Sequence, residues 1–210
     1  MELVLATRNR HKVSEIRAIL QGLSLTIRTL DDFPTVPEVV EDGATCRENA
    51  IKKARVIARE TGKLALADDT GLEVEALGGR PGVYSARFAG EHATFSDNRL
   101  KLLQELKGIS GLKRKALFRC IIVLASPTLV LAAEEGVLSG RIAVQERGQK
   151  GFGYDSILLL PGRRRTLAEM TPEEKNRISH RARALAKIKR HLKRLVSKDP
   201  SQQRGVAQLG

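Results

Sequence analysis

The stretch LALADDTG at residues 64–71 constrains this chain more than any other feature. Its apolar residues, 64–67, are typical of a buried strand, and they end on two adjacent carboxylates, Asp68 and Asp69. A strand end is rigid and the loop beyond it is open, so side chains placed there are held toward a ligand. Two desolvated aspartates resist ionising together, and a hard divalent cation such as Mg²⁺ relieves that repulsion.

A solvated Asp-Asp turn is the alternative interpretation of this pair. The residues that follow favour a functional site instead. Glycines and a proline predict a tight turn at residues 78–82, and residues 84–87 then supply a phenol, a hydroxyl and a guanidinium.

Length and composition indicate one domain, or one domain with a small lobe, built around an aliphatic core. The chain has 210 residues, only 3% of them aromatic, and no tryptophan. We expect residues 1–195 to form this domain. Residues 196–210 are polar and lack periodicity, so we expect them to form a disordered tail.

The positive charge is concentrated near the C-terminus. Twelve basic and three acidic residues lie between Arg163 and Arg194, within a chain whose net charge is +13. Such a concentration predicts an anionic partner, either nucleotide phosphates or nucleic acid, although many of these cations also suit a solvated helix face.

Cysteine usage and hydropathy indicate a cytoplasmic protein without a membrane partner. Cys46 and Cys120 form no CxxC pattern, so we expect reduced, structural thiols. The N-terminal apolar run is too short for a signal peptide, and no apolar run reaches the length of about eighteen residues needed to span a bilayer.

The N-terminal segment has the form of a phosphate-binding site. A strand at residues 2–6 is followed by a polar loop and a helix predicted at residues 12–21. Free backbone N–H groups and the helix dipole favour anions at such a helix start, although no Gly-rich Walker pattern is present. The candidate ligands of this loop are Thr7, Arg8, Asn9, Arg10, His11 and Lys12.

An acidic loop lies between the next predicted strand, at residues 23–30, and the next helix. Thr45 and Glu48 predict a capping box that opens this helix, which runs to about residue 61. We expect Asn49 and Lys53 on it to be surface residues. Glu41, just before the cap, is a candidate to reach a metal held by Asp69.

Three further elements are predicted downstream. Residue 94 or 96 caps a helix whose leucines 100, 103 and 106 are spaced by three. Residues 115–125 and 128–138 predict a long antiparallel hairpin that would form a second lobe. The glycine-rich loop at residues 148–155 carries two aromatic rings, which either stack a base or pack against the loop itself.

Thr171 and Pro172 predict the start of a final helix that continues to Leu195. Arg181 falls on its apolar seam, where an unpaired guanidinium would be costly. It must therefore pair with a core carboxylate or bind a phosphate. Lys175 and His180 lie on the same predicted helix.

These segments together resemble the inosine triphosphate pyrophosphatase family, whose members hydrolyse deaminated purine nucleoside triphosphates. Five of them occur in the family's order, and together they span nearly the whole chain to about residue 195. They are ATRNRHKVSEI (6–16), EDGATCRENAIKKA (41–54), ADDTGLEVEALGGRPGVYSARFAG (67–90), GFGYDSI (151–157) and EKNRISHRARAL (174–185).

The resemblance implies an α/β fold with an elongated mixed β-sheet and flanking helices, forming two lobes around a nucleotide cleft, usually as a homodimer. It implies that Asp69 binds Mg²⁺ and acts as the base, that Asp68 assists as a further metal ligand, and that Glu41 is a second metal ligand, with Glu38 as an alternative. The resemblance also implies the substrate contacts. The loop at residues 7–12 would bind the phosphates, and Thr70 would contact the substrate. The base would be bound by Phe152, Gly153, Tyr154 and Asp155, and phosphate and the purine oxo group would be bound by Lys175, His180 and Arg181.

The chain departs from the family pattern at a few positions without losing a group that the chemistry needs. Thr70 stands where Ser is commoner, Arg8 where Gly is frequent, and Cys46 where Phe is usual. Ser156 replaces the usual Pro, and Val40 stands where some members have another acidic residue, so the metal ligands are not fixed by the pattern.

We therefore expect Mg²⁺-dependent hydrolysis of ITP, dITP or XTP to the monophosphate and diphosphate in the cytoplasm. Two alternatives remain. One is a related pyrophosphatase acting on modified pyrimidine nucleotides. The other is a basic nucleic-acid-binding module, although basic patches also serve nucleotide substrates and we expect no stable nucleic-acid partner.

Overall fold

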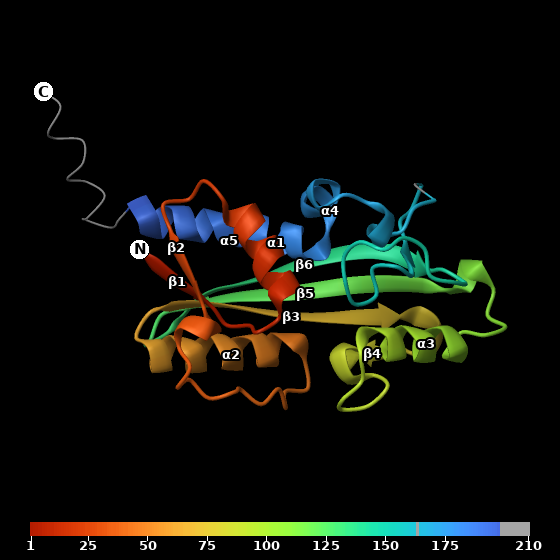
Figure 1. Ribbon diagram of the computed structural model, residues 1–210, viewed down its shortest axis with the longest axis horizontal. Helices are drawn as coiled ribbons and strands as arrows, with labels where there is room; N and C mark the ends of the chain where they lie inside the picture. The colour runs from red at the N-terminus through yellow and green to blue at the C-terminus, as the bar shows by residue number, and fades with distance from the viewer. Residues whose placement is uncertain (163, 198–210) are drawn as a thin grey trace, which may run out of the picture.

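The computed structural model describes residues 1–162 and 164–197, which form an elongated mixed sheet with helices on both faces (Figure 1). The strand order is β2-β1-β3-β5-β6-β7, and β4 pairs with β3. The strands are β1 (Glu2–Leu5), β2 (Thr26–Thr29), β3 (Leu64–Val74), β4 (Pro81–Gly82), β5 (Lys115–Ala125), β6 (Val130–Ile142) and β7 (Leu158–Leu159). The helices are α1 (Arg10–Leu20), α2 (Cys46–Thr61), α3 (Phe95–Glu105), α4 (Pro172–Ile178) and α5 (His180–Ser197). The expected α/β fold is confirmed.

The strand that carries the aspartate pair is longer than expected. The sequence predicts that it ends before Asp68, whereas β3 continues to Val74 because β5 pairs with it in unbroken antiparallel register from Ala65 to Val74. Successive side chains of a strand point to opposite faces. Asp68 and Asp69 therefore lie on opposite sides of the sheet rather than side by side at its end.

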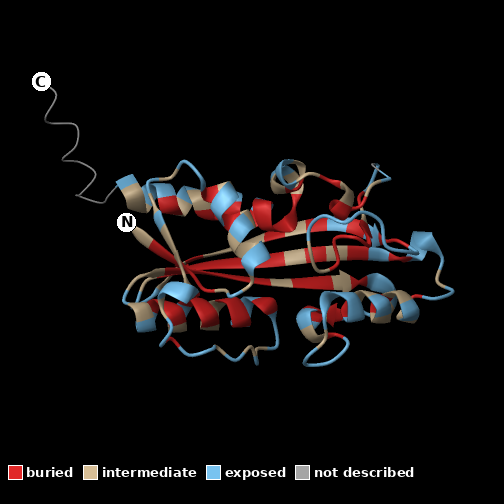
Figure 2. Ribbon diagram, viewed as in Figure 1, coloured by how far each residue is buried: buried red, intermediate tan, exposed pale blue. Residues whose placement is uncertain are grey.

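Each face of the sheet has its own apolar core (Figure 2). On one face, α2 packs its alanines and Ile57 against β1, β3 and β5, and Ala67 and Ile121 belong to this cluster. On the other face, α1 and α5 pack against the alternate residues of the same strands, including Leu66 and Ile122. A third cluster lies toward the other end of the sheet and includes Phe118 from β5, Leu102 from α3 and Tyr154.

The predicted hairpin is present but does not form a lobe by itself. β5 and β6 pair antiparallel along their length, and β5 also pairs with β3. The hairpin thus occupies the middle of the sheet and runs along the long axis of the molecule (Figure 1).

Several predicted boundaries move. α1 begins at Arg10 because Asn9 caps it, and β2 is shortened to Thr26–Thr29. The predicted final helix is two helices, since Ser179 adopts an extended conformation with ψ of 159°. α5 continues through Ser197, two residues into the expected tail, and residues 198–210 lie outside the described part of the chain.

The predicted capping box of α2 is only half formed. Thr45 Oγ1 accepts from the Glu48 amide at 3.2 Å, but Glu48 accepts from the Ala44 amide instead of the Thr45 amide. Asn49, expected at the surface, is 1% exposed, and its Oδ1 accepts from the Gly43 amide at 2.8 Å. This bond ties the acidic loop to α2.

On α3 the predicted inward positions are confirmed at Leu106, which is 0% exposed, and at Leu103, which packs against the core, but not at Leu100. Thr94 caps the helix as expected, yet Leu100 is 51% exposed, whereas Asn98 and Leu102 are buried. Asn98 faces inward because its amide bonds the backbone of the preceding loop, accepting from Ala89 and donating to Ala86. None of the helices formed by residues 1–162 and 164–197 has the length and apolarity that crossing a lipid bilayer requires.

Candidate active site

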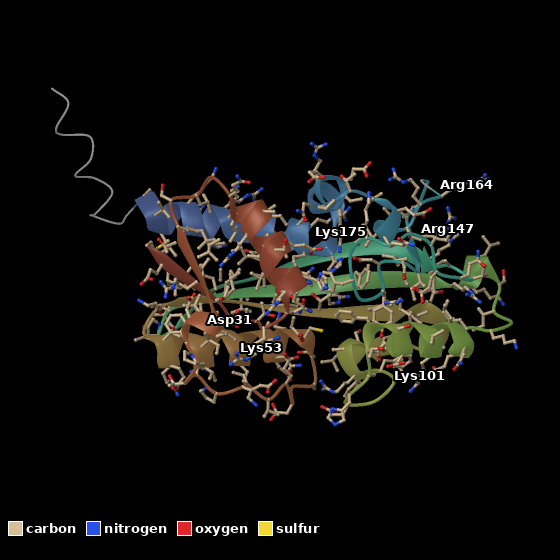
Figure 3. The ribbon with its side chains drawn as sticks, in the orientation of Figure 1. Asp31, Lys53, Lys101, Arg147, Arg164 and Lys175 are labelled. Atoms are coloured by element: carbon tan, nitrogen blue, oxygen red, sulfur yellow. The ribbon has the colours of Figure 1, made fainter. Side chains whose placement is uncertain are left out.

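Asp69 and Lys53 meet on the α2 side of the sheet. Lys53 Nζ donates to Glu41 Oε1 at 2.8 Å and approaches Asp69 Oδ1 at 3.5 Å. Only 8% of Lys53 is exposed, so the expectation that it is a surface residue is wrong. Burial alone would lower the pKa of Lys53, but the carboxylates of Asp69 and Glu41 outweigh burial and raise it. Figure 3 labels Lys53 on α2, across the sheet from Lys175.

Asp69 has an oxygen that no described residue satisfies. Its Oδ2 is buried and without a hydrogen-bond partner in residues 1–162 and 164–197. Burial raises the pKa of Asp69 although Lys53 and Lys12 oppose the shift. A buried, unpaired carboxylate oxygen fits a divalent cation, which would supply the missing partner.

The expected metal ligands do not converge as a set of three. No group of three or more His, Cys, Asp or Glu side chains among the described residues is arranged to hold a metal. Asp69 and Glu41 both approach Lys53, whereas Asp68 points to the other face. Mg²⁺ is commonly held by one or two carboxylates together with substrate phosphates and water, so Asp69 and Glu41 suit that arrangement.

Both carboxylate oxygens of Asp68 have partners within the protein. Its Oδ2 accepts from Arg181 Nε at 2.7 Å and from the Cys120 thiol at 3.1 Å. Its Oδ1 lies 2.6 Å from Lys12 Nζ and accepts from Thr70 Oγ1 at 3.1 Å. Burial alone would raise the pKa of Asp68, but Arg181 and Lys12 hold that pKa well below its ordinary value. Asp68 is therefore an ionised carboxylate that orients its neighbours.

A chain of buried charges extends from Asp68 to the glycine-rich loop. Arg181 also pairs with Glu15 of α1, which lies 2.7 Å from Lys175 Nζ. Lys175 in turn pairs with Asp155. The core carboxylate expected as a partner of Arg181 is present, supplied by Asp68 and Glu15. Sequence analysis missed Glu15, although its position three residues after Lys12 places both side chains on one face of α1.

A polar cavity lies on the α2 side of the sheet, around Asp69, Glu41 and Lys53. Thr7 and Asn9 shape its wall, because Thr7 Oγ1 accepts from the Asn9 amide and Asn9 Oδ1 accepts from the amides of His11 and Lys12 at 3.0 and 3.2 Å. Arg10 is exposed and does not line it. The polar lining includes Thr7, Arg8, Asn9, Lys12, Glu38, Glu41, Lys53, Asp69 and Thr70.

An aromatic cavity adjoins the polar one, and Thr70 and Ala86 line both. Phe152 and Phe95 contribute their rings, with centroids 5.9 Å apart, and His11 stacks on Phe152 at 5.0 Å. The further lining residues include Ser85, Phe118, Gly153, Tyr154, Asp155, Lys175, His180 and Arg181. Sequence analysis missed Phe95 and Phe118, which no motif marks, whereas Ser85 belongs to the stretch 84–87 that was expected to place a hydroxyl near the site.

His180 is a buried, neutral imidazole in the wall of the aromatic cavity. Its ring stacks on Phe118 with centroids 4.4 Å apart, and its Nδ1 has no hydrogen-bond partner in the described part of the chain. Burial lowers the pKa of His180 well below its ordinary value, and the charges of Arg181 and Lys175 lower it further. The unpaired nitrogen is free to bond a ligand.

The two aromatic residues of the glycine-rich loop have different environments. Phe152 is partly exposed in the cavity, with Lys175 Nζ 4.7 Å from its ring centre. Tyr154 is 5% exposed, and its hydroxyl donates to the Ser85 carbonyl at 2.8 Å. One ring is thus available for stacking a base, and the other packs in the core.

Many of the C-terminal cations have structural partners. Arg183 and Lys187 donate to backbone carbonyls of β6, and Lys189 donates to the Ile19 carbonyl of α1. These bonds secure α5 against the sheet. The charge of this helix is therefore partly explained by packing rather than by a polyanionic partner.

A model of the Ham1 family matches residues 3–191. The chain belongs to the Ham1 family. Among its relatives, a protein of Geobacter sulfurreducens named dITP/XTP pyrophosphatase is 52% identical over 190 residues, which cover 90% of this chain and 96% of the relative. A protein of the same name from Geobacillus kaustophilus is 46% identical and covers 93% of this chain and 96% of the relative.

Solved structures of the Ham1 family share the fold. A HAM1 protein from Coxiella burnetii superposes with a TM-score of 0.84 at 41% identity, covering 92% of this chain and 99% of that protein. The Staphylococcus aureus Ham1 protein superposes with a TM-score of 0.82 at 36% identity, covering 93% of this chain and all of that protein. The residues matched by the family model, 3–191, include those that line both cavities of this Ham1 family member.

Proposed function

We propose that this protein hydrolyses deaminated purine nucleoside triphosphates, dITP, ITP and XTP, to the monophosphate and diphosphate. The observation that carries the proposal is the junction at Thr70 of a cavity rich in charged groups with a cavity lined by aromatic rings. A triphosphate suits the first and a purine the second. The names of the Ham1 relatives support the same activity.

The polar cavity is suited to the triphosphate. Lys12 and Lys53 supply positive charge, and the start of α1 adds a helix dipole and the amide-rich loop around Asn9. Because these groups are held by Asp68, Asp69 and the α1 cap before substrate binds, they need little reorganisation to stabilise charge on the phosphates.

Asp69 is proposed as the base that orients the attacking water toward the α-phosphorus. The raised pKa of Asp69 makes this carboxylate a better proton acceptor from water. Lys53 holds the Oδ1 atom of Asp69 in place. Asp69 and Glu41 would hold Mg²⁺, which when bound neutralises charge on the phosphates. Asp68 is proposed to assist by orienting Lys12 and Arg181.

The aromatic cavity is suited to a 6-oxopurine. Phe152 offers a ring for stacking, and His180, neutral and with Nδ1 unpaired, can donate a hydrogen bond to the oxo group in the tautomer protonated at that nitrogen. An adenine amino group there would leave the donor without an acceptor. Such a mismatch can be worth several powers of ten in discrimination.

A substrate panel tests the proposal directly. Purified protein with Mg²⁺ is given ITP, dITP, XTP, ATP, GTP, TTP and a methylated UTP, and released diphosphate is measured. We expect rapid release from the first three and at least a hundredfold lower kcat/KM for ATP. Preference for the pyrimidine nucleotides would establish the alternative pyrophosphatase, and release of orthophosphate in place of diphosphate would contradict the reaction.

We also propose that the protein acts in the cytoplasm as a homodimer. Light scattering coupled to size-exclusion chromatography measures its mass in solution. A mass equal to the 23.1 kDa chain would contradict the dimer.

A further inference from the structure

The backbone of the base-binding loop is held from outside the cavity by a side chain of α3. Arg99 Nη1 donates to the Gly153 carbonyl at 3.0 Å. Arg99 Nε donates to Glu146 Oε2 at 2.8 Å, and Ser156 Oγ donates to that same oxygen at 2.9 Å. Arg99, Glu146 and Ser156 therefore fasten the loop both at Gly153 and just after Asp155. We call these three residues the α3 clamp.

The side chains of the α3 clamp are partly shielded from solvent. Ser156 is 9% exposed, and the side chains of Arg99 and Glu146 are 18% and 35% exposed. A charge-assisted hydrogen bond at such a partly desolvated position is stronger than one in open solvent. Loss of one of these hydrogen bonds would leave the Gly153 carbonyl or the Glu146 carboxylate without that hydrogen-bond partner.

The same helix supplies a wall of the aromatic cavity. Phe95 lies four residues before Arg99, so the two side chains share one face of α3. The Phe95 ring lines the cavity beside Phe152, and Arg99 lines neither cavity. Through α3, the distance between Phe95 and the Phe152 loop is coupled to the bond from Arg99 to Gly153.

We propose that Arg99, together with Glu146 and Ser156, is a positioning residue for nucleobase recognition. The α3 clamp sets where Phe152 and the Gly153 backbone stand relative to Phe95, and so the width of the slot that a purine ring enters. The inference rests on the proposed function, because it assumes that the aromatic cavity binds the base.

The expected kinetic signature follows from where the clamp acts. The base lies far from the bond that is cleaved, so its contacts are the same in the ground state and in the transition state. Losing such uniform binding raises KM and leaves kcat unchanged. Arg99→Met keeps the apolar stem and removes all donors.

We expect Arg99→Met to raise KM for ITP about tenfold with kcat within about twofold of wild type. Ser156→Ala, which removes only the hydroxyl bond to Glu146, should raise KM about threefold. Arg99→Lys, which retains one donor, should recover part of the Arg99→Met loss.

Arg80→Met is the matched control. Arg80 Nη2 pairs with Glu105 at 3.0 Å at the C-terminal end of α3, and no hydrogen bond or ion pair joins the Arg80 side chain to residues 148–156. This variant removes an arginine and an α3 ion pair just as Arg99→Met does, so its KM should equal that of wild type. Equal KM values for the two variants would overturn the proposal.

Binding measurements separate positioning from general damage. Isothermal titration of IMP and of diphosphate reports the base and phosphate sites separately. Arg99→Met should weaken IMP about tenfold and leave diphosphate within about twofold, with an unchanged circular dichroism spectrum. Equal weakening of both ligands would contradict the inference. If wild type released no diphosphate from ITP, dITP or XTP, the proposed function would fall instead.

Discussion

Arg181 and Asp68, 113 positions apart in the sequence, form a buried ion pair through the Arg181 Nε to Asp68 Oδ2 bond of 2.7 Å. Neither side chain is more than 1% exposed. The pair joins the start of α5 to the middle of β3 and so fixes the position of His180 beside Phe118. It is a structural bond at the centre of a proposed catalytic site.

Removing this pair should cost stability. Asp68→Asn removes the carboxylate charge that pairs with both Arg181 and Lys12, and breaking a buried pair costs about 3–5 kcal/mol. The control Asp42→Asn breaks a solvent-exposed pair with Lys52 and should cost clearly less stability than Asp68→Asn. Urea denaturation measures both, and equal losses would contradict the structural role of Asp68.

Asp69→Asn should abolish most turnover without loss of ligand binding. The amide keeps the shape of the carboxylate but cannot accept a proton, so kcat for dITP should fall about a thousandfold. Affinity for IMP, measured by titration, should stay within about threefold because the base cavity is untouched. Turnover near that of the Asp42→Asn control would remove Asp69 from its proposed role as base.

Gly136→Ala should destabilise the fold and the site together. A Cβ on Gly136 of β6 would lie 2.1 Å from the His180 carbonyl oxygen and 2.4 Å from the Ala184 amide nitrogen. The start of α5 must therefore shift, at about 3 kcal/mol, and kcat/KM for dITP should fall as His180 moves. Gly111→Ala, whose Cβ would meet no atom within 4 Å, is the control. Equal melting temperatures for the two variants would contradict this packing.

His180 should make stability fall in mild acid. Its folded pKa lies well below its ordinary value, mainly because of burial, so only the unfolded chain takes up this proton as pH drops below about 6.5. The folded state then loses up to ~1.4 kcal/mol per pH unit from this group. Urea unfolding at pH 7.5 and 5.5 should show a smaller pH difference for His180→Gln than for wild type. An identical difference would contradict a neutral buried His180.

Both cysteines should resist thiol reagents in the folded protein. Burial and the neighbouring Asp69 raise the pKa of Cys46 to about 12, and burial with Asp68 raises that of Cys120 well above its ordinary value. Ellman's reagent at pH 8 should label neither until guanidinium unfolds the chain. Ser110→Cys, at an exposed position, should add one fast-reacting thiol. Fast reaction of an unmodified cysteine would contradict this prediction.

Local patterns predicted much of this molecule. The caps at Thr94 and Thr171, the two long strands and the five family segments were recognisable because each depends on residues close in sequence. The inward-facing Arg181 was also predictable from its place on an apolar seam. Its partner was not, since the carboxylates available to it lie on β3 and α1.

The sequence by itself determined which residue types carry the chemistry, because helix caps, strand periodicity and the family segments each depend on residues that lie close together in the sequence. Only the tertiary structure decided that Asp68 and Asp69 separate to opposite faces, that Lys53 and Glu15 join the site, and that Ser179 separates α4 from α5. Each of these depends on pairing between segments that are distant in the sequence. The register of β5 on β3 determines which face of the sheet each aspartate occupies. A charged side chain is buried only where an opposite charge from a distant segment pairs with it.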